Sequence, residues 1–228
     1  MDLTDALRTT GSVREFTDQP VDDTTLFAIL DDARFAPSGG NRQSWRVIVV
    51  RDQDLRRAVR DIYLDAWHDY IAHLLAGVVP FSPLATDEER SSALALRSAA
   101  EAVSTPEGFA ETLDRVPAML VVCADLHALA ASDRDLERYQ IVGGASVYPF
   151  VWNLILAARD RGLGGVMTTV ATRNEGAMRD VLRIPDHYAV ASIVILGHPV
   201  NRHTRLTRRT VEEFTTVDTF DGPPLGPA

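Results

Sequence analysis

The stretch that decides how the rest of the chain is interpreted is Ala36-Pro37-Ser38-Gly39-Gly40-Asn41-Arg42-Gln43-Ser44-Trp45. It follows an amphipathic helical pattern and precedes the apolar run 47–50, which is typical of a strand. Its two glycines allow the backbone to approach a ligand closely, and four polar side chains surround them, those of Ser38, Asn41, Arg42 and Gln43. Such a lining suits the edge of a flat polar heterocycle. From this segment alone, an ordinary polar loop between a helix and a strand is an equal alternative.

Composition and charge predict a soluble globular protein. The chain has 228 residues and a formal net charge of −9. Nucleic acids and anionic membranes favour clustered positive charge, so neither is expected as the main partner. The first five residues are acidic where a signal peptide would be basic, and no apolar run reaches the roughly 20 residues needed to span a bilayer. We therefore expect a cytoplasmic protein.

Hydrophobic periodicity predicts helices and strands along the whole chain. Helices are expected at 3–8, 23–36, 52–79, 135–161 and 175–182, and strands at 47–50, 118–124 and 190–196. Asp22 or Asp23 can cap the second of these helices. The region between Leu64 and Val116 resembles an insertion, and such regions often cover a site instead of extending a sheet.

Neither a nucleophile nor a metal site is expected from the sequence. Cys123 lies inside the apolar run 119–124 and is predicted to be a small buried strand residue. The histidines show no ligand spacing with each other or with Cys123; they are His68, His73, His127, His187, His198 and His203. The chain also contains no nucleophile elbow and no phosphate-binding P-loop.

Arginines near the two ends of the chain suggest an anion site. The segment 9–16 is rich in hydroxyl groups and is framed by Arg8 and Arg14, a combination that suits a phosphate group. Arg205, Arg208 and Arg209 lie near the other terminus. If the two segments meet, they form one anion pocket. The alternative interpretation is a turn with a surface cation at one end and a solvated basic tail at the other.

Four segments in order resemble the FMN-dependent nitroreductase family: 10–16, 36–45, 153–158 running into 162–164, and 208–213. They cover the chain except for roughly 64–116. The resemblance implies a single α+β domain over 1–228, with a central, mostly antiparallel sheet wrapped by helices and with 64–116 as a helical covering excursion. It also implies an intertwined homodimer in which the C-terminal arm crosses to the partner subunit.

The same resemblance implies two FMN sites at the dimer interface. The phosphate and ribityl chain would be held by Ser12, Arg208 and Arg209. The family commonly has an arginine where Gly11 stands, so Arg8 is a candidate replacement. Arg14 would lie near N1 and the C2 carbonyl, where reduction leaves negative charge. The flavin would be lined from across the interface by Pro37, Ser38, Gly39 and Asn41. Ser146 would lie near the ribityl chain or ring edge, and N5 would be approached by the backbone of Met167, Thr168 and Thr169.

The function implied is ping-pong hydride transfer from NADH or NADPH, through FMN, to a small acceptor such as a nitroaromatic, a quinone or free flavin. No protein side chain is expected to be catalytic in its own right, because the cofactor carries the chemistry and Arg14 acts as an electrostatic stabiliser. Two alternatives stay open. One is an FMN enzyme of a dehalogenating, flavin-cleaving or dehydrogenating branch. The other is a flavin-binding protein without turnover.

Overall fold

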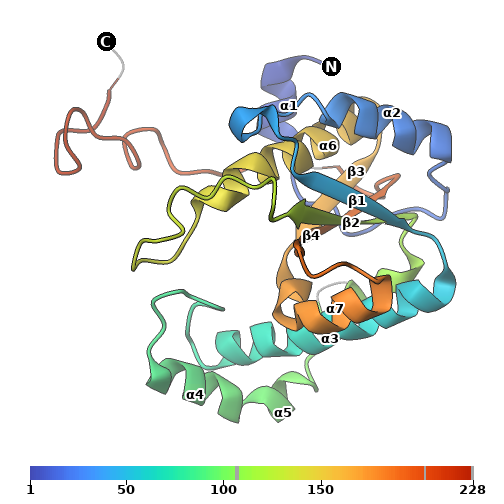
Figure 1. Cartoon of the computed structure of the whole chain (residues 1–228), viewed down its shortest axis with the longest axis horizontal. Helices are drawn as coiled ribbons and strands as arrows, with labels where there is room; N and C mark the ends of the chain where they lie inside the picture. Colours follow the sequence, from blue (N-terminus) through green and yellow to red (C-terminus); the bar gives the residue numbers. More distant parts are fainter. Residues whose placement is uncertain (106–107, 203, 227–228) are drawn as a thin grey trace.

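A computed structural model describes residues 1–105, 108–202 and 204–226, so His203 lies outside the described residues. The fold is α+β and contains a four-stranded sheet in the order β1-β2-β4-β3 (Figure 1). Every pairing between these strands is antiparallel, which confirms the predicted sheet. The strands are β1 (Trp45–Val50), β2 (Ala118–Asp125), β3 (Gly164–Thr168) and β4 (Tyr188–Gly197).

Helices cover both faces of the sheet. One face packs against α2 (Asp23–Ala33) and α6 (Tyr148–Asp160), and the other against α3 (Gln53–Leu75) and α7 (Glu175–Leu182). Alternate residues of β2 enter the two cores: Leu120 and Val122 enter the first, and Met119 and Val121 the second. A strand buried on both faces needs apolar residues at every position, which explains its continuous apolar run.

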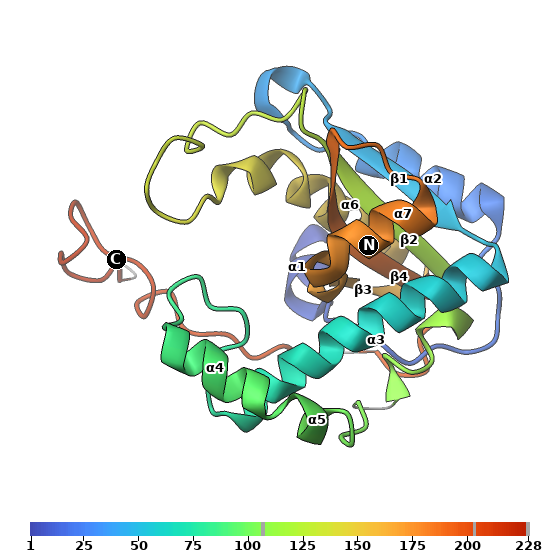
Figure 2. The ribbon, with the colours of Figure 1, turned by 60° about the horizontal axis from the view of Figure 1, so that its bottom comes forward.

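Side-chain caps define where several helices begin. Asp22 is the N-cap of α2, because its carboxylate accepts a 2.7 Å hydrogen bond from the Thr25 backbone N–H. The remaining helices are α1 (Leu3–Thr9), α4 (Asp87–Ala95) and α5 (Arg97–Ala100), and short 3₁₀ turns occur at Gly39–Asn41, Leu113–Arg115, Val142–Ser146 and Val170–Asn174. Figure 2 shows α4 and α5 beside α3. Within the described residues, no helix combines the length and apolar character needed to cross a bilayer.

The long helix predicted at 135–161 is wrong in its first half, because α6 begins only at Tyr148. Residues 135–141 are irregular, and the 3₁₀ turn Val142–Ser146 lies between them and α6. The buried carboxylate of Asp133 accepts hydrogen bonds from the backbone N–H groups of Ile141 (2.8 Å) and Val142 (3.2 Å). These bonds hold a loop that competes with helix, and the following Gly143-Gly144 pair disfavours helix further.

The segment after β4 forms an arm that leaves the body of the molecule (Figure 1). No helix or strand is assigned to its described residues, 198–202 and 204–226. Phe220 is 99% exposed and Phe214 is 60% exposed. Large apolar side chains exposed on an extended segment indicate a surface that gains stability when another surface covers it.

Cys123 is buried in β2, as predicted, and we expect it to be unreactive in the native protein. Burial raises the pKa of its thiol to about 11, and the negative charge of Glu175 adds to this effect. Because only the thiolate reacts, roughly one thiol in a thousand is reactive near pH 8. A chromogenic disulfide reagent should therefore label the native chain very slowly and label one thiol per chain in denaturant. Rapid stoichiometric labelling of the native chain would contradict this assignment.

Candidate functional site

The segment after α1 lies against the outer edge of β3. The Val13 backbone N–H donates to the Gly165 carbonyl oxygen at 2.9 Å, and Ser12 forms a parallel bridge with Gly165. A Cβ atom at Gly164 would lie 2.8 Å from a Val13 methyl carbon, and one at Gly165 would lie 2.7 Å from the carbonyl oxygen of Ile195. Gly164 is therefore required by the approach of Val13, and Gly165 by the close packing of β3 against β4. The backbone bond and bridge to Gly165 hold Ser12 and Val13 at this edge.

Segments near both ends of the chain meet in one cleft of about 490 Å³ beside this edge. Six polar residues line it, three of them arginines and one acidic: Ser12, Arg14, Glu15, Asn201, Arg202 and Arg208. A neighbouring cleft of about 580 Å³ is lined by Arg8, Arg205 and, again, Arg208. Arginines from the two ends of the chain therefore lie near each other, but they are divided between two clefts that share Arg208 and do not form the single pocket expected from the sequence. Arg202 was not predicted to line the cleft. In the described part of the chain, Arg209 is exposed and lines neither of these two clefts.

Arg14 lies close to the end of β3. Its guanidinium carbon is 5.9 Å from the centroid of the Phe109 ring. The hydroxyl groups of Tyr63 and Thr168 lie 3.2 Å apart, within hydrogen-bonding distance. Burial raises the pKa of Tyr63, and both the bond to Thr168 and the positive charge of Arg14 oppose that rise. Arg14, Tyr63 and Thr168 therefore share one electrostatic environment. On the same strand end, Met167 is 38% exposed.

The loop that precedes β1 forms a second group of candidate residues. Gly40 and Asn41 have φ angles of 60° and 53°, which suit glycine and asparagine. The loop closes on itself, since the Gln43 backbone N–H donates to the Ser38 hydroxyl oxygen at 2.9 Å. Gly39 donates its backbone N–H to the hydroxyl oxygen of the buried Ser146 at 3.0 Å. Ser146 therefore belongs with this loop and supports it.

The two groups lie at opposite edges of the sheet. The loop leads into β1, one edge strand, and the arginine cleft flanks β3, the other edge strand. Three interstrand spacings, about 14 Å in all, separate these strands. Figure 2 shows the segment between α2 and β1 at the top of the view, away from α1 and β3. Within one chain, the described loop and cleft are therefore separate surfaces.

Comparison with known proteins gives the family. The profile of the Nitroreductase family matches residues 7–198. The chain is 25% identical over 222 residues to a nitrobenzene nitroreductase of Ectopseudomonas oleovorans, covering 94% of this chain and 96% of that one. It is 22% identical over 219 residues to the FMN reductase [NAD(P)H] of Bacillus subtilis (strain 168), covering 92% and 70%. Its fold resembles that of an iodotyrosine deiodinase bound to FMN and 3-iodo-L-tyrosine, with a TM-score of 0.65, 20% identity and coverage of 96% and 100%.

These similarities agree with the sequence motifs and with the antiparallel α+β fold. The family profile begins within α1 and spans all four strands and the loop that precedes β1. The chain therefore belongs to the Nitroreductase family and is an oxidoreductase.

Proposed function

We propose that this protein is an FMN-dependent NAD(P)H oxidoreductase that reduces a small acceptor. The observation that carries the proposal is the meeting of Ser12, Arg14 and Arg208 in one cleft beside β3. Guanidinium groups bind phosphate by charge-assisted hydrogen bonds, and a hydroxyl group adds a further hydrogen-bonding group. The donor set in the cleft thus fits the anionic end of FMN. The relative from Bacillus subtilis, an FMN reductase [NAD(P)H], supports the choice of cofactor and of reductant.

Each residue has a proposed role in holding the cofactor. Arg208 and Ser12 would bind the phosphate and ribityl chain, and Arg8 would add charge from the neighbouring cleft, which it shares with Arg208. Arg209 is exposed on the arm and is proposed to turn toward the phosphate when the cofactor binds. Arg14 would face the pyrimidine edge of a bound flavin ring, and the backbone of 167–169 would approach its N5 atom. Bound FMN would take hydride from NAD(P)H and pass it to the acceptor. Arg14 supplies a fixed positive charge where negative charge develops, and it needs no proton transfer to do so.

We further propose that the working unit is a homodimer in which the loop of one chain completes the cleft of the other. The separation of loop and cleft supports this assembly, because in a dimer with a suitably placed two-fold axis each loop would meet the partner's cleft. Pro37, Ser38, Gly39 and Asn41 then line the ring, and Ser146 fixes the loop through its bond to Gly39. The exposed apolar arm is proposed to cross to the partner.

The acceptor is proposed to be a nitroaromatic or a quinone. The similarity to a nitrobenzene nitroreductase supports the first class. The fold shared with an iodotyrosine deiodinase keeps reductive dehalogenation as the alternative. Residues 64–116 are proposed to cover the acceptor side of the single domain, because Phe109 from this region lies beneath Arg14.

The experiment that tests this function is an anaerobic titration of the FMN-loaded protein with NADH and with NADPH. We expect the flavin absorbance to bleach with at least one of them and to return when nitrobenzene or a quinone is added. Bound FMN that neither nucleotide bleaches would indicate a flavin-binding protein without turnover. Bleached protein that only a halotyrosine reoxidises would indicate the dehalogenating alternative.

A further inference from the structure

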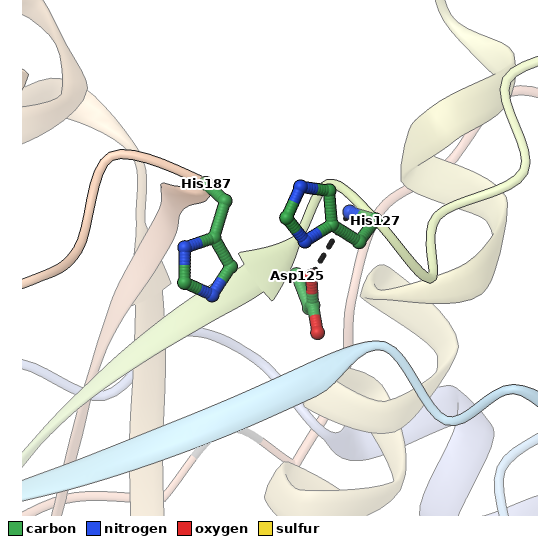
Figure 3. Close-up of side chains that lie close together, drawn as sticks. All are labelled: Asp125, His127 and His187. Atoms are coloured by element: carbon green, nitrogen blue, oxygen red, sulfur yellow. Dashed lines mark hydrogen bonds between the residues drawn. The ribbon is translucent and has the colours of Figure 1, made fainter.

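Three metal-ligating side chains come together outside the proposed flavin cleft, at the ends of two paired strands (Figure 3). They are Asp125, His127 and His187, and their ligand atoms all lie within 4.8 Å of one another. The sequence spacing of the histidines did not indicate this cluster. It exists because β2 and β4 pair antiparallel, which sets Asp125 opposite Tyr188 and so brings two distant segments side by side.

The backbone beneath the cluster is held by hydrogen bonds. The Leu126 backbone N–H donates to the His187 carbonyl oxygen at 2.8 Å, which fixes one histidine against the strand that bears the other groups. The His127 backbone N–H donates to a carboxylate oxygen of Asp125 at 2.9 Å (Figure 3). Asp125 is itself anchored by its own N–H, which donates to the Ser44 carbonyl oxygen at 2.7 Å. The ligands therefore start from a preorganised frame.

The side chains have room to adjust around an ion. His127 is exposed, whereas Asp125 and His187 are half-buried, so the cluster opens to solvent on one side. The two imidazole rings stack with centroids 4.8 Å apart and planes within 10°. In a tetrahedral zinc site, ligand atoms lie about 3.3 Å from one another, so the cluster must contract by up to about 1.5 Å. One of the two near-parallel rings must also turn so that both nitrogens point at the ion, and the exposed His127 ring has the room to do so.

The charges around the cluster are compatible with a cation. In the described ranges 1–105, 108–202 and 204–226, no ion pair joins Asp125 to an arginine or histidine. At Cys123, two residues before Asp125, the negative charge of Glu175 and the positive charge of Arg46 act with opposite sign. The net charge of the chain, −9, favours cations in general. Within the described ranges, the carboxylate of Asp125 is therefore not occupied by an ion pair that would compete with a metal ion.

We propose that Asp125, His127 and His187 bind a divalent transition-metal ion, Zn²⁺ or one with similar ligand preference. Two imidazoles and one carboxylate are a donor set that such ions accept, and they leave a coordination position for water. The ion would clamp the start of β4 to the end of β2. Through Asp125 and Ser44, it would also brace the end of the loop that precedes β1.

The test is calorimetric titration of tag-free, chelator-stripped protein, loaded with its flavin, with Zn²⁺. We expect saturable binding of one ion per chain, and at least about tenfold weaker binding in each of H127Q, H187Q and D125N. The matched control is H68Q, which removes an imidazole from α3 and should bind Zn²⁺ like the unmodified chain. H127Q is the decisive variant, because its exposed side chain can be replaced without disturbing the core.

A second measurement is the visible spectrum after addition of Co²⁺, whose absorption bands report coordination number. We expect bands of a four- or five-coordinate ion in the unmodified chain and in H68Q, and their loss in H127Q and H187Q. The absence of saturable Zn²⁺ binding would overturn the proposal. Unchanged affinity in H127Q and H187Q would overturn it as well, since the ion would then lie elsewhere.

Discussion

Removing residues 205–228 should leave a protein that no longer retains FMN and no longer forms a stable dimer. The arm supplies Arg208 to the proposed phosphate cleft, and its removal also opens one wall, formed by Leu206. The arm exposes large apolar side chains, including Phe214 and Phe220, that we propose are covered by the partner chain. We expect at least about a hundredfold loss of FMN affinity, because two contacts are lost together. These are the charge-assisted contact of Arg208 with the phosphate and the contact with the partner's loop, which depends on the dimer. Fluorescence titration of FMN and analytical ultracentrifugation measure the two effects.

The matched control keeps the arm and removes one charge. Arg208→Gln should lose FMN affinity by about tenfold or more and remain a dimer, because the apolar residues of the arm are intact. A truncated chain that binds FMN as tightly as the full chain would contradict the proposed role of the arm. A truncated chain that stays dimeric would place the interface on other exposed residues, such as Phe27 and Phe35 of the α2 region.

Arg14→Met should slow the reduction of bound flavin by about a hundredfold while weakening FMN binding much less. The substitution removes a fixed positive charge from the place where the proposed reaction develops negative charge, and preorganised charges of this kind contribute on the order of 10²–10³ in rate. Methionine keeps apolar contact with Phe109, so the local packing is largely retained. Anaerobic stopped-flow reduction with NADH or NADPH gives the rate, and fluorescence titration gives the affinity.

Arg14→Lys separates charge from shape in this experiment. Lysine keeps the positive charge but lacks the planar donors of the guanidinium group, so we expect a loss of about tenfold or less. Equal losses in the methionine and lysine variants would show that geometry and not charge is responsible. Unchanged reduction in Arg14→Met would remove the electrostatic role assigned to Arg14.

Local signals in the sequence were sufficient for much of the fold. The helix predicted at 175–182 is α7 with the same bounds, because its amphipathic pattern is closed by Pro185 shortly after it. Asp22 caps α2 as one of two predicted alternatives. The continuous apolar runs at 118–124 and 190–196 became the two central strands, β2 and β4, since only central strands are buried on both faces.

Features that depend on distant residues were missed. The first half of the helix predicted over 135–161 is instead a loop held by Asp133, and helical periodicity gives no sign of such a competing carboxylate. Strand β3 was not predicted, because Gly164 and Gly165 are poor strand formers by themselves, and they are required here by Val13 and by strand β4, respectively. Arg202 was missed as a cleft residue because no local motif marks it. Its place in the cleft depends on the contact between the segment after β4 and the segment after α1. No local motif marks the Asp125–His127–His187 cluster either.

The central claim is that one flavin site is built from the cleft of one chain and the loop of its partner. Coexpression of two defective chains tests it most directly. Arg208→Glu places a negative charge in the cleft, and Gly39→Asp places one on the exposed loop. Each variant alone should bind little FMN. In mixed dimers one site carries both changes and the other carries neither, so random pairing should restore about a quarter of the flavin content of the unmodified protein. Mixed dimers without flavin, formed by two well-folded variants, would contradict the shared site.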